Sequence, residues 1–551
     1  MDRLVRNGKT LLSGVDPAGR GERLADSVSV KDRILYICPS PLYGHGLSRF
    51  ISRLETQAPN SALLCIEADK ELFCLAQKNI DSTVTENKKF HLTNICEGEK
   101  LYTLVRNTWG VRAFRRVETI RFTGGWQLFP ELYDSLCEIL NREIITDWSN
   151  ALTLARLGRL YIRNALRNLT LVSQFPSIAG LSFGSSNVLV LGAGPSLDFT
   201  LDAVNRELPN DHKNRAFKII CVDTCLGALK DRGIVPDLAV ILESQHWNLR
   251  AFTGINGWNI PAAIDLSSLP ASAKKLGGNG CLFMTPWTHL RIFERLQTAG
   301  LLPAVLPPLG SVGLTAVKLA RRLTTGKIIC AGLDFSFTQD LYHARSTPGH
   351  RNKLNSKNRF RTILNLEECD KHSFAVLSKS GSFVRSNPIM INYRNLFEQE
   401  FAGNGQIFDI EGSGLPLGLK TLSMKEALAL LDQKEFGRKP NNRTNHYKNI
   451  AAHVFDLDEV RSKNKKLKSF YEGELNRLEE LRDMLSGETA SDALRLGALI
   501  EECDYLWAHF PDYAGGRSHD LTDISFLKRV RTEIDPMFAL IKRQQKAILH
   551  Q

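Results

Sequence analysis

Residues 188–198 read VLVLGAGPSLD, and this stretch decides the fold of the central part of the chain. Its four apolar residues fit a buried parallel strand, and the Gly-Ala-Gly-Pro-Ser turn that follows leads into a helix. Open α/β sheets bind ligands at the carboxyl ends of their strands, and glycines let the backbone approach phosphate oxygens. We therefore expect a phosphate here, although a plain strand-to-helix connection has the same glycine spacing. The expected contacts are Gly192, Gly194, Pro195 and Ser196.

Strand-length apolar runs alternate with helical patterns on both sides of this turn. The alternation predicts a central, doubly wound Rossmann-like α/β domain, which we expect to be accompanied by an N-terminal α/β domain and a C-terminal helical domain. The expected central strands are 188–191, 218–222, 238–242, 262–264, 281–284 and 327–330.

Polar residues follow the second and third of these strands. Asp223 and Thr224 end the second strand, where Asp223 is placed to accept hydrogen bonds from a ribose or a base. A helix-capping aspartate would have the same position. Glu243 follows the third strand and fits a hydrogen-bond acceptor, a metal ligand, a base or a solvated carboxylate equally well. Asp237 precedes that strand, so we expect it to be structural.

Two later segments should reach the same edge of the sheet. Ser311 and Gly313 open a helix and offer a second phosphate contact, or an ordinary helix cap. Asp334 follows the strand 327–330, and Tyr342 and His343 come shortly after it. We expect Asp334, His343 and Glu243, in that order, to be the candidate catalytic groups. Tyr342 is a further candidate for phosphate contact, although histidines in loops are more often plain surface residues.

Four regions follow from the patterning along the chain. We expect an N-terminal α/β domain over 1–126, connecting helices over 127–184, the catalytic domain over 185–425 and a helical domain over 440–551. Strands 34–38 and 62–67 should flank a helix over 46–57, and Glu67 at the second strand end is interpreted as structural because the first turn lacks a Gly-x-Gly-x-x-Gly motif. Residues 341–366 hold six Lys or Arg and no carboxylate, which predicts a mobile loop.

Composition narrows the class of protein. The 551 residues are about three to four times the usual domain length. No apolar run is long enough to span a membrane, and residues 1–7 lead into no signal-peptide core, which predicts a cytoplasmic protein. The eleven cysteines form no Cys-x-x-Cys pair, so no structural zinc site is expected. The net charge of +12 fits anionic ligands, and no nucleic-acid-binding motif is present.

Taken in order, these segments resemble the motility-associated factor family of flagellin glycosyltransferases, in the broader group that includes 6-hydroxymethylpterin pyrophosphokinase-like (MptE-like) proteins. The resemblance spans roughly residues 185–420, and parts of it are shared with bacterial sialyltransferases that use CMP-activated sugars. It is carried by GAGPSLD (192–198), VDT (222–224), GIVPD (233–237), GSVG (310–313), GLDF (332–335), SGSF (380–383), NP (387–388) and EGSG (411–414).

The resemblance implies an enzyme that transfers a nonulosonic acid, of pseudaminic or legionaminic type, from its CMP form to Ser or Thr hydroxyls of flagellin. It implies that Gly194, Ser196 and Ser311 hold the phosphate of the donor, that Asp223 and Thr224 orient the nucleotide, and that the basic 341–366 segment neutralises the leaving group. No cofactor is firmly implied; we expect chemistry without a metal, with a divalent metal as the alternative. The C-terminal helices are expected to form a bundle or an oligomer contact.

Two rival functions stay open, and one departure from the family pattern favours the second of them. Many relatives end the third strand with Asp-Pro, whereas this chain has Glu243-Ser244. The first rival is an ATP-dependent pyrophosphokinase of 6-hydroxymethylpterin, with Asp223, Asp237 and Glu243 as metal-site acids. The second is a flagellin-binding assembly factor that keeps the fold without turnover.

Overall fold

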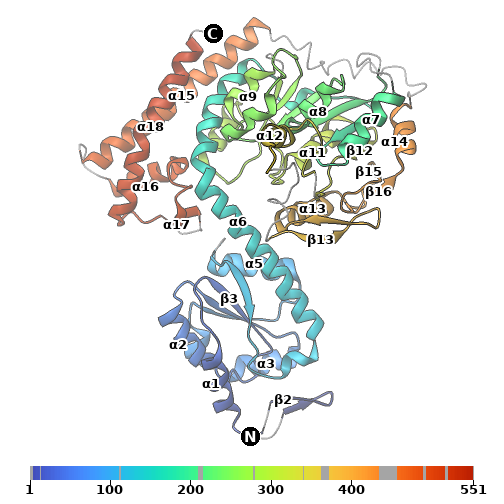
Figure 1. The fold of residues 1–551 in the computed structure, drawn as a ribbon. Helices are drawn as coiled ribbons and strands as arrows, with labels where there is room; N and C mark the ends of the chain where they lie inside the picture. The colour runs from blue at the N-terminus through green and yellow to red at the C-terminus, as the bar shows by residue number, and fades with distance from the viewer. Residues whose placement is uncertain are drawn as a thin grey trace. The chain divides into compact units, whose positions relative to one another are not determined.

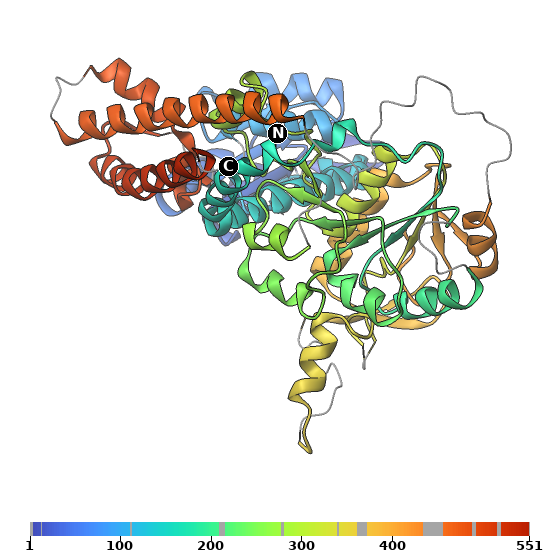
Figure 2. The ribbon, with the colours of Figure 1, turned by 90° about the horizontal axis from the view of Figure 1, so that it is seen from above.

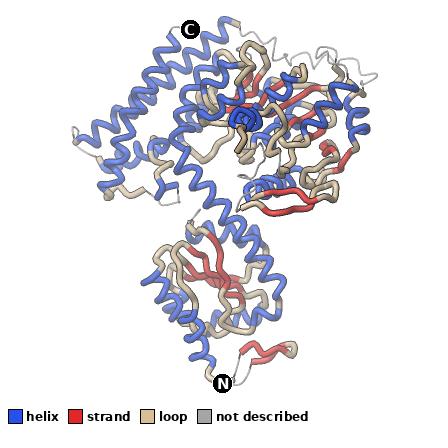
Figure 3. Tube along the Cα trace, in the orientation of Figure 1, coloured by secondary structure: helices blue, strands red, loops and turns tan. Residues whose placement is uncertain are grey.

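The structure is a computed structural model and describes residues 4–12, 14–110, 113–208, 215–276, 280–338, 341–360, 372–433, 456–487, 492–514 and 519–549. Contacts divide the chain into two compact units. The first contains Met1–Gly158 and Trp507–Phe526, and the second contains Arg159–Leu506 and Leu527–Gln551. Figures 1 and 3 show that each unit has its own β-sheet with helices around it.

The first unit is built on a four-stranded parallel sheet with the order β5-β4-β3-β6. All six residues of β3 are buried, which agrees with an apolar strand that has helices on both faces. The predicted strands and helix of this region are confirmed to within a few residues. Its strands are β1 (Leu4–Arg6), β2 (Lys9–Leu12), β3 (Ile34–Pro39), β4 (Ala62–Ile66), β5 (Phe90–Thr93) and β6 (Arg116–Thr119). Its helices are α1 (Pro17–Ser27), α2 (Leu47–Gln57), α3 (Lys70–Asn79), α4 (Ser82–Thr85), α5 (Gly98–Trp109) and α17 (Pro511–Ala514).

Glu67, directly after β4, is fully buried inside this unit. Its carboxylate accepts hydrogen bonds from the Ser40 hydroxyl, the Asp69 amide and the Tyr133 hydroxyl. Burial raises the pKa of Glu67, against these hydrogen bonds. The carboxylate is therefore occupied by protein donors, as the structural interpretation expects.

The second unit contains an eight-stranded sheet with the order β11-β10-β9-β8-β7-β12-β15-β16, in which every neighbouring pair is parallel. The predicted doubly wound fold is confirmed, and each expected central strand lies within about one residue of its observed position. The strands are β7 (Val188–Leu191), β8 (Lys218–Val222), β9 (Leu238–Ile241), β10 (Ala262–Asp265), β11 (Gly280–Phe283), β12 (Ile328–Ala331), β15 (Ile407–Ile410) and β16 (Lys420–Leu422), with a separate hairpin of β13 (Phe374–Leu377) and β14 (Phe383–Ser386).

The order of these strands identifies the ligand-binding edge. From β7 the sheet grows outward through β8 to β11, and the chain then returns to add β12 on the other side of β7. The winding direction thus reverses between β7 and β12. In open α/β sheets a crevice for ligands forms at such a switch point, outside the carboxyl ends of the strands.

Helices cover both faces of this sheet and extend beyond it (Figure 1). Helix α11 packs against β7, β8, β9 and β12, while α14 packs against α7. The helices of the second unit are α7 (Leu197–Glu207), α8 (Leu226–Asp231), α9 (Pro270–Lys275), α10 (Arg291–Thr298), α11 (Val312–Leu323), α12 (Pro348–Ser356), α13 (Pro388–Phe401), α14 (Met424–Leu431), α15 (Leu457–Ser486) and α16 (Ala493–Glu502); α6 (Pro130–Asn168) and α18 (Ile524–Leu549) contain residues of both units. Short 3-10 helices occur at Gly125–Leu128, Leu169–Ser173, Ile178–Gly180, Asp223–Cys225, His246–Phe252 and Asp504–Leu506.

The expectation of a loop over 341–366 is wrong for its middle part, because Pro348–Ser356 forms helix α12. Pro348 occupies the first turn, where a missing N–H costs nothing, and the following residues include no β-branched side chain. None of the α12 residues is buried, and Figure 2 shows the helix projecting from the α/β region. Residues 361–366 of the predicted loop lie outside the described residues.

The apolar side chains of the long C-terminal helix α15 pack within the chain. Leu467, Tyr471 and Leu478 of α15 are fully buried, and the Tyr471 hydroxyl donates to the Leu166 carbonyl at 2.8 Å. Glu474 on the same helix is also fully buried and binds Arg295 of α10 through two hydrogen bonds of 2.7 and 2.9 Å. Figure 2 shows α15 and α18 side by side, and the Arg482 guanidinium lies over the Phe538 ring. These contacts bury a large part of the apolar face of α15 inside the chain.

None of the helices in the described part of the chain is both long and apolar enough to cross a membrane.

Candidate active site

The glycine turn after β7 packs directly against the turn after β12. The amide of Gly192 donates to the Ala331 carbonyl and that of Gly194 to the Gly332 carbonyl, both at 2.8 Å. A Cβ atom on Gly192 would lie 2.4 Å from the Gly332 carbonyl oxygen, and one on Gly194 would lie 2.5 Å from Asp334 Oδ2. Glycine is therefore required at both positions by the contact between the two turns, whether or not a phosphate binds there.

Asp334 lies at the centre of this contact. Its side chain accepts hydrogen bonds from the Ser196 amide, at 2.7 Å, and from the Ser196 hydroxyl. Asp334 is only 3% exposed, and burial raises its pKa, against the effects of the Ser196 hydrogen bonds and the Lys379 charge. Its carboxylate thus lies at the amino end of α7, where the helix dipole favours negative charge. The structure thus brings Ser196 and Asp334 together, and the amide and hydroxyl of Ser196 are used in hydrogen bonds to the Asp334 carboxylate.

A buried ion pair lies close to Asp334. The Lys379 ammonium donates to both oxygens of Asp409 at 2.8 and 2.7 Å, and the two side chains are almost completely buried. Burial raises the pKa of Asp409 to about 6, even though Lys379 lowers it. The backbone links the pair to the site, because the Lys379 amide donates to the Gly414 carbonyl and the next amide, of Leu415, donates to the Asp334 carbonyl. We infer that the pair holds the 412–415 segment against the β12 turn.

Tyr342 and His343 also lie beside the glycine turn. The Ala344 amide donates to the Ala193 carbonyl at 2.9 Å, and the Arg345 amide donates to Asp198 at 3.0 Å. The Tyr342 ring lies 4.9 Å from the His343 ring, and both side chains are half-buried. The segment after Asp334 thus returns to the carboxyl end of β7, so both residues lie at the edge predicted from the sequence.

A second group of polar residues follows β8 and β9. Asp223 Oδ1 accepts hydrogen bonds from the Thr224 amide and hydroxyl, at 2.7 and 3.2 Å. The Asn248 side-chain amide lies beside this carboxylate and interacts with it, although Oδ2 of Asp223 and Nδ2 of Asn248 form no hydrogen bond of full geometry. Burial, with a smaller effect of the Glu243 charge, raises the pKa of Asp223 to about 6, although the nearby Asn248 amide and the Thr224 hydrogen bonds lower it. Asp223 is therefore a buried acid at the ligand-binding edge, held by Thr224 and Asn248.

Glu243 is half-buried and more accessible than Asp223 or Asp334. Its Oε1 atom accepts a hydrogen bond from the Gln245 amide at 2.8 Å. Burial raises the pKa of Tyr161 to about 12 and also raises that of Tyr393, and in both cases the Glu243 charge adds to the shift. Two tyrosine hydroxyls are thus close enough to Glu243 to respond to its charge.

Tyr393 connects this group to the amino end of α11. A Cβ atom on Gly310 would lie 3.2 Å from the Tyr393 ring, and one on Gly313 would lie 2.6 Å from the Leu333 side chain. Ser311 is the N-cap residue of α11, yet its hydroxyl makes no capping hydrogen bond. The amino end of α11 therefore offers a hydroxyl and amides near the β12 turn, which suits an anion.

Five residues near the candidate site were not predicted from the sequence: Tyr161, Asn248, Lys379, Tyr393 and Asp409. Asn248 follows Glu243 by five residues, and Lys379 directly precedes the SGSF stretch, so local sequence gives some signal for these two. Tyr161 lies on α6 and Tyr393 on α13, far along the chain from Glu243. Only the folded structure brings them to the site.

Asp237 lies at the opposite edge of the sheet from Asp223. It precedes β9 and binds Arg215, Lys218 and the Ile219 amide. The expectation of a structural role is confirmed, and the three acids of the pyrophosphokinase alternative do not meet. Within the described ranges, no group of three or more His, Cys, Asp or Glu side chains is placed to hold a metal ion.

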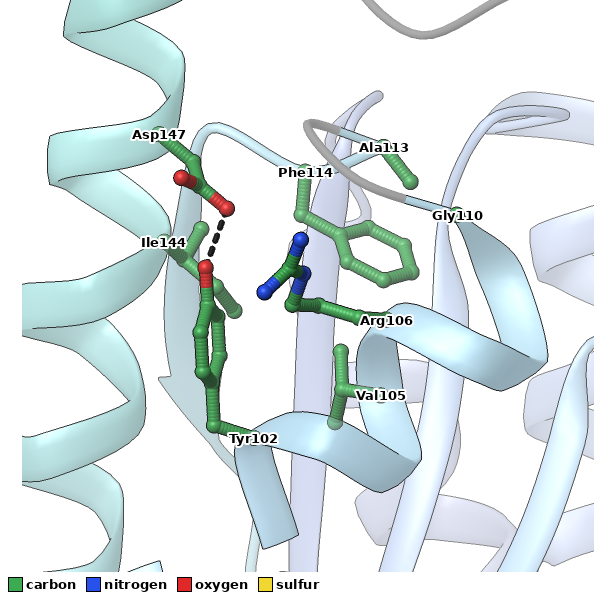
Figure 4. Close-up of a pocket in the computed structure, with 8 residues that line it drawn as sticks. All are labelled: Tyr102, Val105, Arg106, Gly110, Ala113, Phe114, Ile144 and Asp147. Atoms are coloured by element: carbon green, nitrogen blue, oxygen red, sulfur yellow. Dashed lines mark hydrogen bonds between the residues drawn. The ribbon is translucent and has the colours of Figure 1, made fainter. Parts of the chain in front are cut away.

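The first unit contains a separate small pocket, shown in Figure 4, with a cavity volume of only about 10 Å³. At this pocket the Tyr102 hydroxyl donates to Asp147, and the Arg106 guanidinium lies 5.5 Å from the centre of the Tyr102 ring. Val105, Phe114 and Ile144 supply apolar walls. The polar groups that face this pocket are already paired with each other, so few of them are left to bind a ligand.

Comparisons with known proteins agree with the fold. The family model described as 6-hydroxymethylpterin diphosphokinase MptE-like matches residues 161–340, which include β7 to β12. A solved structure, the MAf glycosyltransferase from Magnetospirillum magneticum AMB-1, matches with a TM-score of 0.51 at 14% identity, over 98% of this chain and 85% of that chain. A protein of Treponema pallidum (strain Nichols), described as an uncharacterized protein, is 30% identical over 533 residues, which cover 95% of this chain and 90% of the relative. The chain therefore belongs to one family with this treponemal protein, its central domain is MptE-like, and its fold is that of a Maf glycosyltransferase.

Proposed function

We propose that the chain is a glycosyltransferase that moves a nonulosonic acid, of pseudaminic or legionaminic type, from a CMP-sugar to Ser or Thr hydroxyls of flagellin. One observation carries the proposal: the strand-end segments meet at the β7/β12 switch point, in a chain that matches a glycosyltransferase fold over 98% of its length. The proposed setting is the cytoplasm, during assembly of the flagellar filament.

The nucleotide is proposed to lie along the carboxyl ends of β7 and β8. The amino end of α11, with Ser311 and Gly313, is the better-supported phosphate position, because Asp334 already occupies the Ser196 groups at the start of α7. Gly192, Gly194 and Pro195 shape the turn beside it. Asp223 and Thr224 would orient the nucleoside, and Tyr342 with basic residues of the 341–360 segment would face the leaving phosphate.

In the transfer step the bond between the anomeric carbon and the CMP phosphate oxygen breaks, and the acceptor oxygen forms a new bond to that carbon. CMP leaves with the bonding electron pair, and the acceptor hydroxyl gives up its proton to a base. Glu243 is the best-placed base, because it is half-buried and not held by a buried hydrogen-bond network. Asp334 is better suited to position Ser196, and His343 is the second candidate for the base. No metal is needed in this scheme, since positive groups can stabilise the leaving phosphate.

The MptE-like match makes pyrophosphate transfer the second candidate function. Two assays of the purified chain distinguish these activities. One mixture contains a CMP-nonulosonic acid and flagellin, and the other contains ATP, Mg²⁺ and 6-hydroxymethylpterin. We expect CMP release in the first mixture and no AMP in the second, because Asp237 lies far from Asp223 and Glu243 across the sheet. AMP formation that depends on the pterin, without CMP release, would support the pyrophosphokinase instead. Binding to flagellin with neither product would support the assembly factor.

A further inference from the structure

Helix α6 passes the carboxyl ends of β9 and β10 and is fastened there by a buried asparagine. The Nδ2 atom of Asn164 donates to the carbonyls of Ser244 and Ser267, at 3.0 and 3.1 Å, which follow β9 and β10. Ser244 is the residue after Glu243. Tyr161 precedes Asn164 by three positions and so lies on the same side of the helix. The hydrogen bonds of Asn164 therefore fix Tyr161 beside the strand end that carries Glu243.

Trp287 supplies a second aromatic ring at the same edge of the sheet. It comes shortly after β11, the strand next to β10. The centre of its ring lies 5.0 Å from that of Tyr161 and 5.2 Å from that of Phe293, which is buried. Tyr161 and Trp287 themselves are half-buried. The two rings therefore form a supported aromatic surface that stays partly accessible near Glu243.

Tyr393 links Glu243 to the amino end of α11, the better-supported phosphate position. A Cβ atom on Gly310 would lie 3.2 Å from the Tyr393 ring. Tyr393 also interacts electrostatically with Glu243 and with Tyr161. In a transfer reaction the transferred group lies between the leaving phosphate and the base, because the carbon that loses the phosphate oxygen gains the acceptor oxygen. Tyr393 contacts the region where that group must lie.

The hydroxyls of Tyr161 and Tyr393 form no hydrogen bond with any other residue in the described ranges. Elsewhere in the chain, the hydroxyls of Tyr36, Tyr133 and Tyr471 all donate to carbonyl or carboxylate oxygens. Buried tyrosines usually find such a partner. Burial raises the pKa of both Tyr161 and Tyr393, so both hydroxyls keep their protons at neutral pH and can donate as well as accept. Two hydroxyls beside a carboxylate are thus left for a ligand.

We propose that Tyr161, Trp287 and Tyr393 form the subsite for the transferred sugar, with the Tyr161 and Trp287 rings against its apolar face and the two tyrosine hydroxyls bonded to its polar substituents. Aromatic walls with a few placed polar groups are typical of small-molecule sites. A sugar matches them, because its C–H groups pack on rings while its hydroxyl and N-acyl groups exchange hydrogen bonds. This inference rests on the proposed function, since it takes the donor to be a CMP-nonulosonic acid.

The test compares the affinity of the full chain for CMP with its affinity for CMP-pseudaminic acid and CMP-legionaminic acid, by isothermal titration calorimetry without flagellin. In the unaltered protein we expect the preferred CMP-sugar to bind at least about tenfold more tightly than CMP, because the sugar adds hydrogen bonds and apolar contact. Tyr161→Phe and Tyr393→Phe should each reduce this gain by about threefold to tenfold, the effect of one lost hydrogen bond, with the affinity for CMP itself unchanged within about twofold. Tyr43→Phe, at a half-buried tyrosine of the first unit, is the matched control and should leave the gain intact.

The remaining outcomes each count against the inference. If CMP binds but the CMP-sugars bind no more tightly, or if both tyrosine variants keep the full gain, the sugar subsite is overturned and the CMP site stands. If the variants keep the gain and instead raise the KM for flagellin, the cluster binds the acceptor, and the assignment to the donor sugar is overturned. If neither CMP nor a CMP-sugar binds to protein whose thermal unfolding is cooperative, this inference and the proposed function fail together.

Discussion

Glu243→Gln is expected to reduce sugar transfer to flagellin by about 10²–10⁴-fold, the usual contribution of a general base. Glutamine keeps the size of the side chain and can still accept the Gln245 amide hydrogen bond, which is 2.8 Å long in the structure. It cannot take the proton of the acceptor hydroxyl. The effect should therefore appear in kcat, with the affinity for CMP unchanged within about threefold.

Glu207→Gln serves as the matched control for this variant. Glu207 is the last residue of α7, is exposed and pairs with its neighbour Arg206, so its replacement should leave transfer unaffected. The measurement is the initial rate of CMP release and of flagellin modification, with CMP affinity determined separately. A Glu243→Gln enzyme with nearly normal kcat would exclude Glu243 as the base and make His343 the next group to replace.

Asp223→Asn is expected to stabilise the protein at pH 8 while weakening nucleotide binding. The pKa of Asp223 is raised from its ordinary 3.8 to about 6, so the folded state holds this proton more tightly than the unfolded state does. The contribution of Asp223 to stability is complete below about pH 4, declines as the pH rises, and is lost above about pH 6. Asparagine carries no charge at any of these pH values. We therefore expect the variant to be more stable than the unaltered protein by on the order of 1–3 kcal/mol at pH 8, with no difference near pH 4.

Asp237→Asn offers a control of the same chemistry with the opposite expected sign. Asp237 pairs with Arg215, whose side chain is only 4% exposed, and with Lys218 at 3.1 Å. Loss of this carboxylate leaves a buried cation without its partner, which should destabilise the protein by about 3–5 kcal/mol. Urea unfolding at pH 4, 6 and 8 measures both variants. A loss of stability in Asp223→Asn that grows as the pH rises would show that the ionised carboxylate stabilises the fold, which contradicts a raised pKa of Asp223.

The strands and turns of the second unit could be predicted because local sequence determines them. VLVL at 188–191 and IICA at 328–331 are too apolar for any position but a covered parallel strand, and the glycines after each strand mark the turns. Because parallel strands place their carboxyl ends at one edge, Asp223, Glu243 and Asp334 could be assigned to that edge without knowledge of any contact. Helix α12 was missed because nothing in its weak amphipathic pattern separates it from a polar loop.

The pairing of side chains within the site could not be predicted. Sequence places Asp334 at a strand end, but it does not show that the carboxylate turns inward to bind Ser196 and leaves Glu243 as the accessible acid. Tyr161 comes near Glu243 because of how α6 packs beside the sheet. Tyr393 reaches the site because α13 contacts Gly310. Long-range packing, which local patterns do not encode, decides both.

The most direct test of the proposed function is the intact mass of flagellin after co-expression with this chain in cells that make a CMP-nonulosonic acid. We predict a mass increase of one or more sugar units that requires the chain and disappears with Glu243→Gln. Flagellin of unchanged mass, in cells where the donor is confirmed to be present and the chain is folded, would contradict it.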